Sequence, residues 1–260
     1  MPELLEVEIY RRLADSVVGA TVQGVAAHDH WYLKGTTSAR LLQRELVGAT
    51  VVGTHRIGKL LLLSFGERPV LGLRFGMTGR LIVGGTAAID YLEYSSARDE
   101  PAWDRFVLRF ADGTDLRMRD PRRLGGVELN PSTDHLGPDA LTVTPSQLRM
   151  ALLGAAAPLK ACLLDQRRLA GVGNLLADET LWRAALDPAR RGGSLTLAEH
   201  RRLHRHLRIT LPELLDRGGS HMGDLHHARV RGGRCPRDGV ELLRRTIGGR
   251  TTYSCPRHQH

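Results

Sequence analysis

Hydrophobic positions recur at helical spacing near the start of the chain and at strand-like spacing after it. Leu4 and Val7 begin a helical repeat that predicts a helix over residues 3–15, and Gly19 ends it. From residue 22 to residue 129 the hydrophobic runs are shorter and are separated by Gly and Asp-Gly turns, as is typical of β-strands. These runs predict strands at residues 59–65, 70–75, 80–83, 106–110 and 115–118.

A polar, turn-prone stretch that starts at Asn130 separates this part from a second part with another periodicity. Hydrophobic positions then return to helical spacing, with Gly-rich breaks, and a basic segment from about residue 229 carries two short strands. The helices are predicted at residues 145–154, 158–168, 174–185 and 197–217. The pattern therefore predicts an α+β chain with a β-rich first domain, a helical second domain and a small C-terminal ribbon. The corresponding boundaries are 1–130, a linker at 131–143, 144–228 and 229–260.

The charge balance narrows the class of partner. The 260 residues include 37 Lys and Arg against 28 Asp and Glu, a net charge of +9, which suits a polyanion such as nucleic acid. No hydrophobic run approaches the roughly 20 residues that cross a bilayer. Acids at Glu3, Glu6 and Glu8 stand where a signal peptide would carry bases, so we expect a cytoplasmic, nucleoid-associated protein. Three cysteines do not suggest a disulfide framework.

The first residues combine a potential nucleophile with acids. Removal of Met1 would leave Pro2 with a secondary amine, which can attack a sugar carbon and form an iminium intermediate. Glu3 lies beside this amine and Glu6 lies about one helical turn further on. Taken alone, a Pro followed by acids is more typical of a helix start. The catalytic interpretation therefore depends on the rest of the chain.

Five segments of the chain support the catalytic interpretation, because they match the motifs of one known family in the same order. They are residues 1–8 (MPELLEVE), 57–62 (IGKLLL), 74–79 (RFGMTG), 120–125 (DPRRLG) and 165–174 (DQRRLAGVGN). The sequence resembles the formamidopyrimidine-DNA glycosylase and endonuclease VIII family from residue 1 to residue 174, and the C-terminal ribbon extends the match. The resemblance implies an N-terminal β-sandwich with an N-terminal helix, a helix–two turns–helix domain and a C-terminal β-hairpin zinc ribbon.

The resemblance also implies the catalytic groups. Pro2 would be the nucleophile, with Glu3 as the proton donor to the sugar and Glu6 nearby. Lys59 opens a hydrophobic strand, where a charge is unfavourable unless it faces a groove or solvent. We expect Lys59 to position a phosphate, and a solvated strand end is the alternative. No redox or nucleotide cofactor is required.

Further residues would contact duplex DNA. By resemblance, Met77, Arg122 and Leu124 fill the gap left by a flipped base, with packing filler as the alternative for Met77. Many family members have Phe where this chain has Leu124, which leaves the preferred opposite base open. The glycines before Asn174 allow backbone N–H groups to approach a phosphate. The matching phosphate ligands, Lys160, Asn174 and Arg250, complete the expected contacts of a monomer.

The ribbon departs from the family in its expected metal ligands. The family's two Cys-x2-Cys pairs become Cys235-x2-Asp238 and Cys255-x2-His258, with the family's spacing of sixteen residues between them. Asp and His also bind zinc, so these four residues predict one structural Zn²⁺, with His260 as an alternative ligand to His258. A ribbon without metal, held by packing, is the other interpretation.

Together these features predict a base-excision-repair DNA glycosylase that also cleaves abasic sites by β,δ-elimination. In members of the resembling family that prefer oxidised purines, a longer loop closes over the flipped base. Only 15 residues lie between Gly219 and Cys235 here, so the resemblance implies an open pocket and a preference for oxidised pyrimidines and abasic sites. The alternatives are a purine-type enzyme for 8-oxoguanine and formamidopyrimidine, or a catalytically silent paralogue that binds damaged DNA. A zinc-ribbon regulatory protein would leave Lys59, Met77 and Asn174 unexplained.

Overall fold

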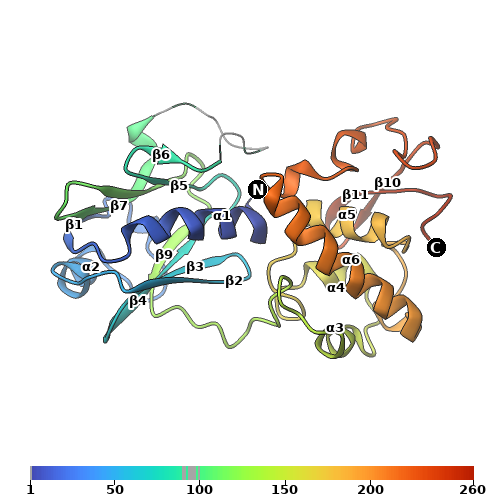
Figure 1. Cartoon of the computed structure of the whole chain (residues 1–260), viewed down its shortest axis with the longest axis horizontal. Helices are drawn as coiled ribbons and strands as arrows, with labels where there is room; N and C mark the ends of the chain where they lie inside the picture. The colour runs from blue at the N-terminus through green and yellow to red at the C-terminus, as the bar shows by residue number, and fades with distance from the viewer. Residues whose placement is uncertain (1, 90–91, 93–97, 99) are drawn as a thin grey trace. The chain divides into compact units, whose positions relative to one another are not determined.

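The computed structural model describes residues 2–89, 92, 98 and 100–260, which form two compact units. The first unit contains Pro2 and residues 6–133, and the second contains residues 3–5 and 134–260. Among the described residues, the strands of the first unit form a four-stranded and a five-stranded sheet (Figure 1). No described helix is long and hydrophobic enough to cross a membrane.

All neighbouring strands of the two sheets are antiparallel. The five-stranded sheet has the order β1-β7-β8-β5-β6, and the four-stranded sheet has the order β2-β3-β4-β9. The strands are β1 (Val22–Ala26), β2 (Gly53–Ile57), β3 (Leu60–Phe65), β4 (Arg68–Arg74), β5 (Arg80–Val83), β6 (Thr86–Ala87), β7 (Asp104–Phe110), β8 (Asp115–Arg119) and β9 (Gly126–Leu129).

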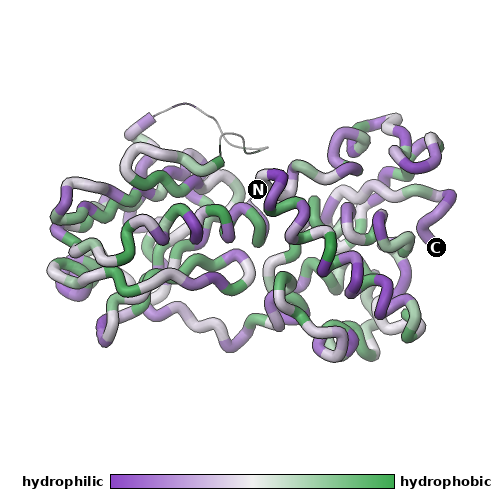
Figure 2. Tube along the Cα trace, viewed as in Figure 1, coloured by the Kyte–Doolittle hydropathy of each residue, from purple (hydrophilic) through white to green (hydrophobic). Residues whose placement is uncertain are grey.

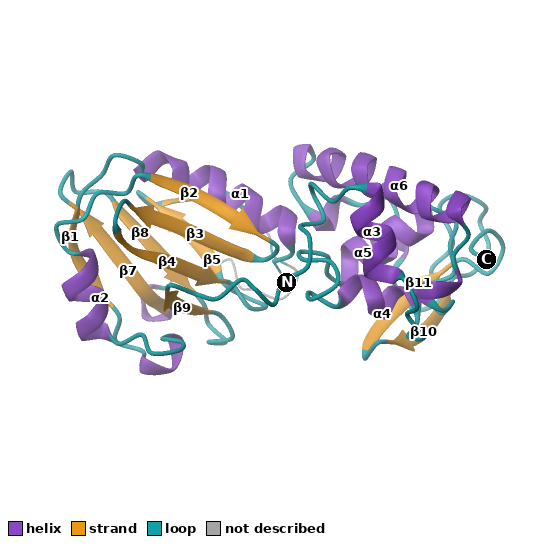
Figure 3. Ribbon diagram, turned by 90° about the horizontal axis from the view of Figure 1, so that it is seen from below, coloured by secondary structure: helices purple, strands orange, loops and turns teal. Residues whose placement is uncertain are grey.

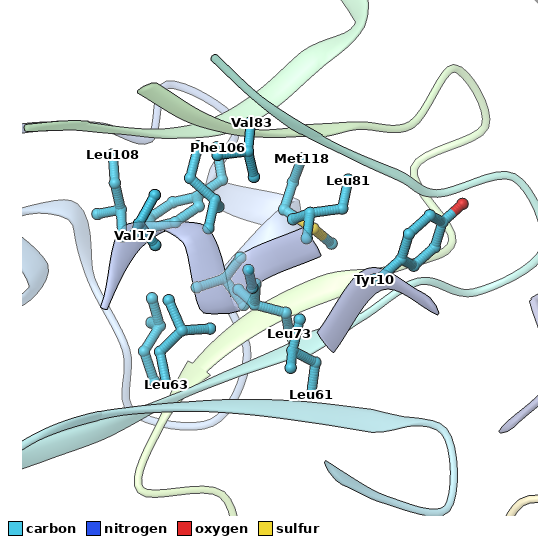
Figure 4. Close-up of a cluster of buried hydrophobic side chains, with 14 of the residues drawn as sticks. Tyr10, Val17, Leu61, Leu63, Leu73, Leu81, Val83, Phe106, Leu108 and Met118 are labelled. Carbon is cyan, nitrogen blue, oxygen red and sulfur yellow. The ribbon is translucent and has the colours of Figure 1, made fainter. Parts of the chain in front are cut away.

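The two sheets enclose one hydrophobic core, because alternate strand residues point to opposite faces of a sheet. Leu61 and Leu73 of the four-stranded sheet belong to the same buried cluster as Phe106 and Met118 of the five-stranded sheet. Figure 4 shows these side chains converging, with Tyr10 of helix α1 among them. The expected β-sandwich with an N-terminal helix is confirmed.

Two helices accompany the sandwich, and the second was not predicted. Helix α1 spans Leu4–Ala14 and helix α2 spans Ala39–Leu46. Ser38 caps α2 by accepting a hydrogen bond from the Leu41 N–H. Because only Leu42 and Leu46 of α2 are buried, its hydrophobic stripe is too short to stand out from the strand pattern around it.

The second unit is helical, and its two well-marked helix starts carry capping boxes. Thr144 and Gln147 bond reciprocally at the start of α3, and Thr196 and Glu199 do so at the start of α6. Hydrophobic and hydrophilic segments alternate along α6, as expected for a helix with one buried face (Figure 2). The helices are α3 (Pro145–Leu152), α4 (Leu159–Leu164), α5 (Asn174–Arg183) and α6 (Leu197–Asp216).

A β-hairpin completes the second unit. Strands β10 (Leu243–Ile247) and β11 (Arg250–Ser254) pair antiparallel, and β11 packs against α5 (Figure 3). Gly248 and Gly249 form the two-residue turn with φ of 59° and 71°, a conformation that glycine adopts without strain. Short 3-10 helices occur at Asp15–Val17, His30–Tyr32, Pro101–Trp103, Gly192–Ser194, Ser220–Met222 and His226–Ala228.

Candidate functional site

The start of the chain is buried and held by backbone groups. Pro2 is buried, and the Leu4 N–H donates to the Gly171 carbonyl over 3.1 Å. The removal of Met1, on which the nucleophile depends, concerns a residue outside the described part of the chain.

Glu3 lies at the N-terminus of helix α5, with 1% of its surface exposed. Its carboxylate accepts hydrogen bonds from the N–H groups of Gly173 (2.8 Å), Leu175 (2.8 Å) and Leu176 (3.2 Å). A Cβ on Gly173 would lie 2.2 Å from the Glu3 Cδ atom, so only glycine permits this approach. We expected the glycines before Asn174 to bring these N–H groups to a phosphate. That expectation is wrong for Gly173, because its N–H donates to Glu3.

Tyr10 connects helix α1 to the turn that carries Met77. Glu6 is 1% exposed, and burial together with the nearby Glu6 carboxylate raises the pKa of Tyr10. The Tyr10 hydroxyl donates to the Gly79 carbonyl over 3.4 Å, and its ring centroid lies 4.6 Å from that of Phe75. Glu6 lies one helical turn before Tyr10 on α1, and Tyr10 contacts the residues that flank the Met77 turn.

Lys59 lies in a turn and not in a strand. Strand β2 ends at Ile57, strand β3 begins at Leu60, and these two residues are paired across the sheet. Gly58, with φ of 56°, and the half-buried Lys59 form the connection between them. This position removes the difficulty of a charge inside a hydrophobic strand, since the ammonium belongs to the tip of the β2–β3 hairpin.

Met77, Arg122 and Leu124 come from two adjacent loops joined by one carboxylate. Asp120 accepts hydrogen bonds from the Thr78 hydroxyl (2.5 Å) and from the N–H groups of Arg122 (3.2 Å) and Gly125 (2.8 Å). Asp120 is fully buried, and these three donors provide the hydrogen bonds that a buried carboxylate needs. We call residues 76–78 and 120–125 the finger loops.

The finger loops are in backbone contact. A Cβ on Gly76 would lie 2.4 Å from the carbonyl carbon of Leu124, which explains the glycine. Leu124 is 49% exposed, Arg122 is exposed and Met77 is half-buried. The loops therefore present hydrophobic and cationic groups to solvent from a rigid base, the arrangement that a wedge between bases needs.

Lys160 is not available to DNA. It is 0% exposed, and its Nζ atom lies 2.7 Å from the Asp178 carboxylate and donates to the Thr252 hydroxyl over 2.8 Å. Burial lowers the pKa of Lys160, while Asp178 acts in the opposite direction. The expected phosphate contact is wrong, because the ammonium would have to leave a buried ion pair. Lys160 instead connects α4 to α5 and β11.

The other two expected phosphate ligands lie at element ends. Asn174 is the first residue of α5 and is half-buried. Arg250 begins β11 at the exposed tip of the hairpin. Both positions can present donors to a ligand at the surface of the second unit.

The four predicted metal ligands lie together. The ligand atoms of Cys235, Asp238, Cys255 and His258 are all within 4.8 Å of one another. The Nε2 atom of His258 lies 3.3 Å from the Trp182 carbonyl, while Nδ1 lies 2.8 Å from an Asp238 oxygen. With Nε2 protonated and donating to the carbonyl, Nδ1 is left to bind a metal. Two thiols, one carboxylate and one imidazole fit tetrahedral Zn²⁺. His260 is not part of this cluster.

Three acids important to this arrangement were missed in the sequence. Asp120 organises the finger loops, Asp178 pairs with Lys160, and Glu179 accepts from the N–H groups of Asp224 (3.1 Å) and Leu225 (2.9 Å). The adjacent Asp178 and Glu179 stand in a hydrophobic stretch that becomes a buried helix. Buried carboxylates require partners. Two adjacent acids in a hydrophobic stretch could therefore have been recognised from the sequence as residues with structural partners.

Comparison with known proteins gives the family. The model of the formamidopyrimidine-DNA glycosylase N-terminal domain matches residues 1–127, and that of the H2TH domain matches residues 136–225. The chain belongs to the formamidopyrimidine-DNA glycosylase family. It is 34% identical to the formamidopyrimidine-DNA glycosylase of Paracoccus denitrificans, over 98% of this chain and 99% of that protein. It is 36% identical to the enzyme of Thermus thermophilus, over 98% and 97% of the two chains.

Solved structures support the same family assignment. The chain matches the Lactococcus lactis enzyme in complex with abasic-site DNA, with a TM-score of 0.82 and 27% identity over 99% of both chains. A second complex of that enzyme, with DNA containing a formamidopyrimidine base, matches with a TM-score of 0.82. The predicted family, fold, enzyme class of DNA glycosylase with lyase activity, and DNA partner are confirmed.

Proposed function

We propose that this protein excises oxidised purines, such as 8-oxoguanine and formamidopyrimidines, and then cleaves the abasic site. The observation that carries the proposal is the full-length similarity to enzymes named for formamidopyrimidine. The predicted preference for oxidised pyrimidines is not supported, since these relatives favour the purine-type alternative. The Lactococcus enzyme has also been crystallised with DNA containing an oxidised pyrimidine, so both lesions belong in the test.

In the proposed reaction the Pro2 amine attacks the anomeric carbon of the damaged nucleotide. The C–N bond to the base breaks and the base leaves with the bonding electrons. The C1′–O4′ bond then breaks, and the iminium formed by this ring opening allows β- and then δ-elimination. Glu3 donates a proton to the sugar as its ring opens. The three N–H groups that hold Glu3 fix the position of its carboxylate, which supports a role for this residue in the reaction. Lys59 positions a phosphate near the reacting sugar, and Glu6 supports this group of residues.

We further propose that the finger loops and the second unit divide the DNA contacts. Met77, Arg122 and Leu124 fill the space of the flipped base, while Asn174 and Arg250 contact phosphates. Their positions at exposed loops and element ends support this division. Residues 1–130 and 144–228 would then act as the catalytic and DNA-binding domains, with 131–143 as linker and 229–260 as ribbon. The substrate is duplex DNA in the nucleoid.

The cluster of Cys235, Asp238, Cys255 and His258 would hold one Zn²⁺ in a structural role. When bound, the ion cross-links the hairpin segment, whose few hydrophobic residues form only a small cluster with Trp182. Around it, Trp182 Nε1 donates to the Cys235 Sγ atom over 3.3 Å. This support would hold the strand that begins at Arg250.

Borohydride trapping on an abasic duplex tests the nucleophile. Borohydride reduces the iminium, so the processed protein should form a covalent complex, and Pro2→Gly should form much less. A protein with an acetylated N-terminus is the control, because its amine cannot attack. Equal trapping by that protein would move the nucleophile to a lysine, and no trapping by the wild type would favour the silent paralogue.

Competition between lesions tests the substrate class. We expect a higher kcat/KM for 8-oxoguanine opposite cytosine than for thymine glycol in a matched duplex. The reverse preference would restore the pyrimidine interpretation that follows from the short segment between Gly219 and Cys235.

A further inference from the structure

Arg123 has a backbone conformation that its side chain disfavours. Its φ is 58°, and it stands between Arg122 and Leu124 in the second finger loop. Non-glycine residues in this left-handed region carry strain, which persists only where surrounding contacts maintain it. The contacts of Arg123 therefore decide how the two residues on either side of it are presented.

The contact that maintains this conformation is a two-pronged ion pair with Asp29. Arg123 Nε lies 2.6 Å from one Asp29 oxygen, and a terminal nitrogen lies 2.7 Å from the other. Hydrogen bonding to Arg123 holds the pKa of Asp29 below its usual value. Paired, planar hydrogen bonds of this kind fix the orientation of the guanidinium as well as its position.

Asp29 is itself held rigidly. Its side chain is 10% exposed, and it caps the short helix His30–Tyr32 by accepting from the Trp31 N–H over 3.1 Å. Tyr32, at the end of this helix, is fully buried in the core of the sandwich. The position of Asp29 is therefore set by the core and not by the loop that it contacts.

Packing does not hold the Arg123 side chain. A cavity of about 490 Å³ is lined in part by Asp29, Arg105 and Arg123, and the Arg123 side chain is 45% exposed. Asp120 holds the backbone of the loop by accepting from the N–H groups of Arg122, Arg123 and Gly125. The guanidinium of Arg123 adds the side-chain contact that ties this turn to Asp29.

We propose that the Asp29–Arg123 ion pair is a positioning device for the finger loops. It keeps Arg123 in the left-handed conformation, so that Arg122 and Leu124 are presented to DNA before binding and need not be ordered during it. This inference rests on the proposed role of those two residues as a wedge. Without the pair, φ of Arg123 relaxes to an ordinary value and redirects its neighbours. Base eversion from a duplex slows, whereas chemistry on an already unpaired nucleotide does not.

The test compares Asp29→Asn with wild type on two substrates. Asn keeps an oxygen to accept from the Trp31 N–H but loses the charge. We expect kcat/KM on a duplex lesion to fall about ten-fold to a hundred-fold, as misplaced groups typically cost, with borohydride trapping on a single-stranded abasic oligonucleotide unchanged. Asp15→Asn is the matched control, because it removes another ion pair, with Arg11 at 2.7 Å, away from the finger loops.

Variants of Arg123 separate strain from charge. Arg123→Gly adopts φ of 58° without strain and should lose less activity on duplex than Arg123→Ala. The exchange of Asp29→Arg with Arg123→Asp should restore part of the activity, since Asp tolerates the left-handed region. Equal losses for Gly and Ala, with no recovery in the exchange, would overturn the proposal.

A fluorescent base makes the test independent of catalysis. With 2-aminopurine opposite an uncleavable abasic analogue, wedge insertion should raise the emission for wild type and much less for Asp29→Asn. Equal emission for the two proteins would reject the positioning role. Absence of trapping by wild type would instead reject the proposed chemistry, and the emission would still decide the role of the ion pair.

Discussion

Glu3 is held by three backbone N–H groups, an arrangement that its amide analogue cannot reproduce. One oxygen accepts from Gly173 and Leu176, and the other accepts from Leu175. In Glu3→Gln an NH₂ group must face at least one of these donors and leave it unsatisfied. We expect a loss of about 1–3 kcal/mol in the free energy of unfolding. Denaturant unfolding measures this loss, and an unchanged midpoint would contradict the structural role.

A second prediction at the scale of single residues concerns a substitution of Lys160. Lys160→Met leaves Asp178 buried with one cationic partner fewer, Arg229 at 3.0 Å being the other. Breaking a buried ion pair typically costs about 3–5 kcal/mol, and we expect a value near the lower end because Arg229 stays. The salt dependence of DNA binding should not change. A salt slope that flattens by about one unit would restore the phosphate contact.

At the scale of elements, the zinc content of the protein tests whether a metal ion at the four candidate ligands holds the hairpin. Elemental analysis of protein purified without chelator should give about one zinc per chain, and Cys235→Ser should lose it. The double variant Asp238→Cys with His258→Cys is the control, because four thiolates also bind zinc tetrahedrally. The affinity for DNA should fall in Cys235→Ser and should equal that of the wild type in the control. A metal-free wild type with full affinity would favour a hairpin held by packing.

The hairpin differs from the sandwich in what stabilises it. The sandwich has a large core, in which residues from both sheets are buried. The hairpin contributes Leu242, Tyr253 and two cysteines to a small cluster with Trp182 and Leu225. A metal cross-link therefore matters for this element and for no strand of the sandwich.

At the scale of the whole molecule, the net charge of +9 predicts a strong dependence of DNA binding on salt. The logarithm of affinity should fall linearly with the logarithm of salt concentration, by about 0.9 for each phosphate neutralised. Arg250→Ala should flatten this slope by about one unit, since Arg250 is exposed at the hairpin tip. The slope follows from titrations at several salt concentrations. An unchanged slope would remove Arg250 from the contacts.

The sequence by itself indicated the family, the order of the β-rich and helical parts, and the four candidate metal ligands. Strand β5 has the predicted bounds, and β3 begins one residue later than predicted, because alternation and helical repeats are local properties of the chain. The cluster was predictable because Cys235-x2-Asp238 and Cys255-x2-His258 keep the sixteen-residue spacing of the family's two ligand pairs. The order of five motifs indicated the family, since chance does not place several motifs in register.

Only the tertiary structure decided which polar groups meet. Lys160 bonds Thr252, Glu3 bonds Gly173, and Arg123 bonds Asp29 across 92, 170 and 94 positions of sequence. A charge in a motif predicts that a partner exists, but the sequence alone does not say whether that partner is DNA or another residue. Burial decides it, because a charge enclosed with its counterion has no phosphate within reach. For that reason Lys160 was predicted as a DNA ligand and is instead part of the protein's interior.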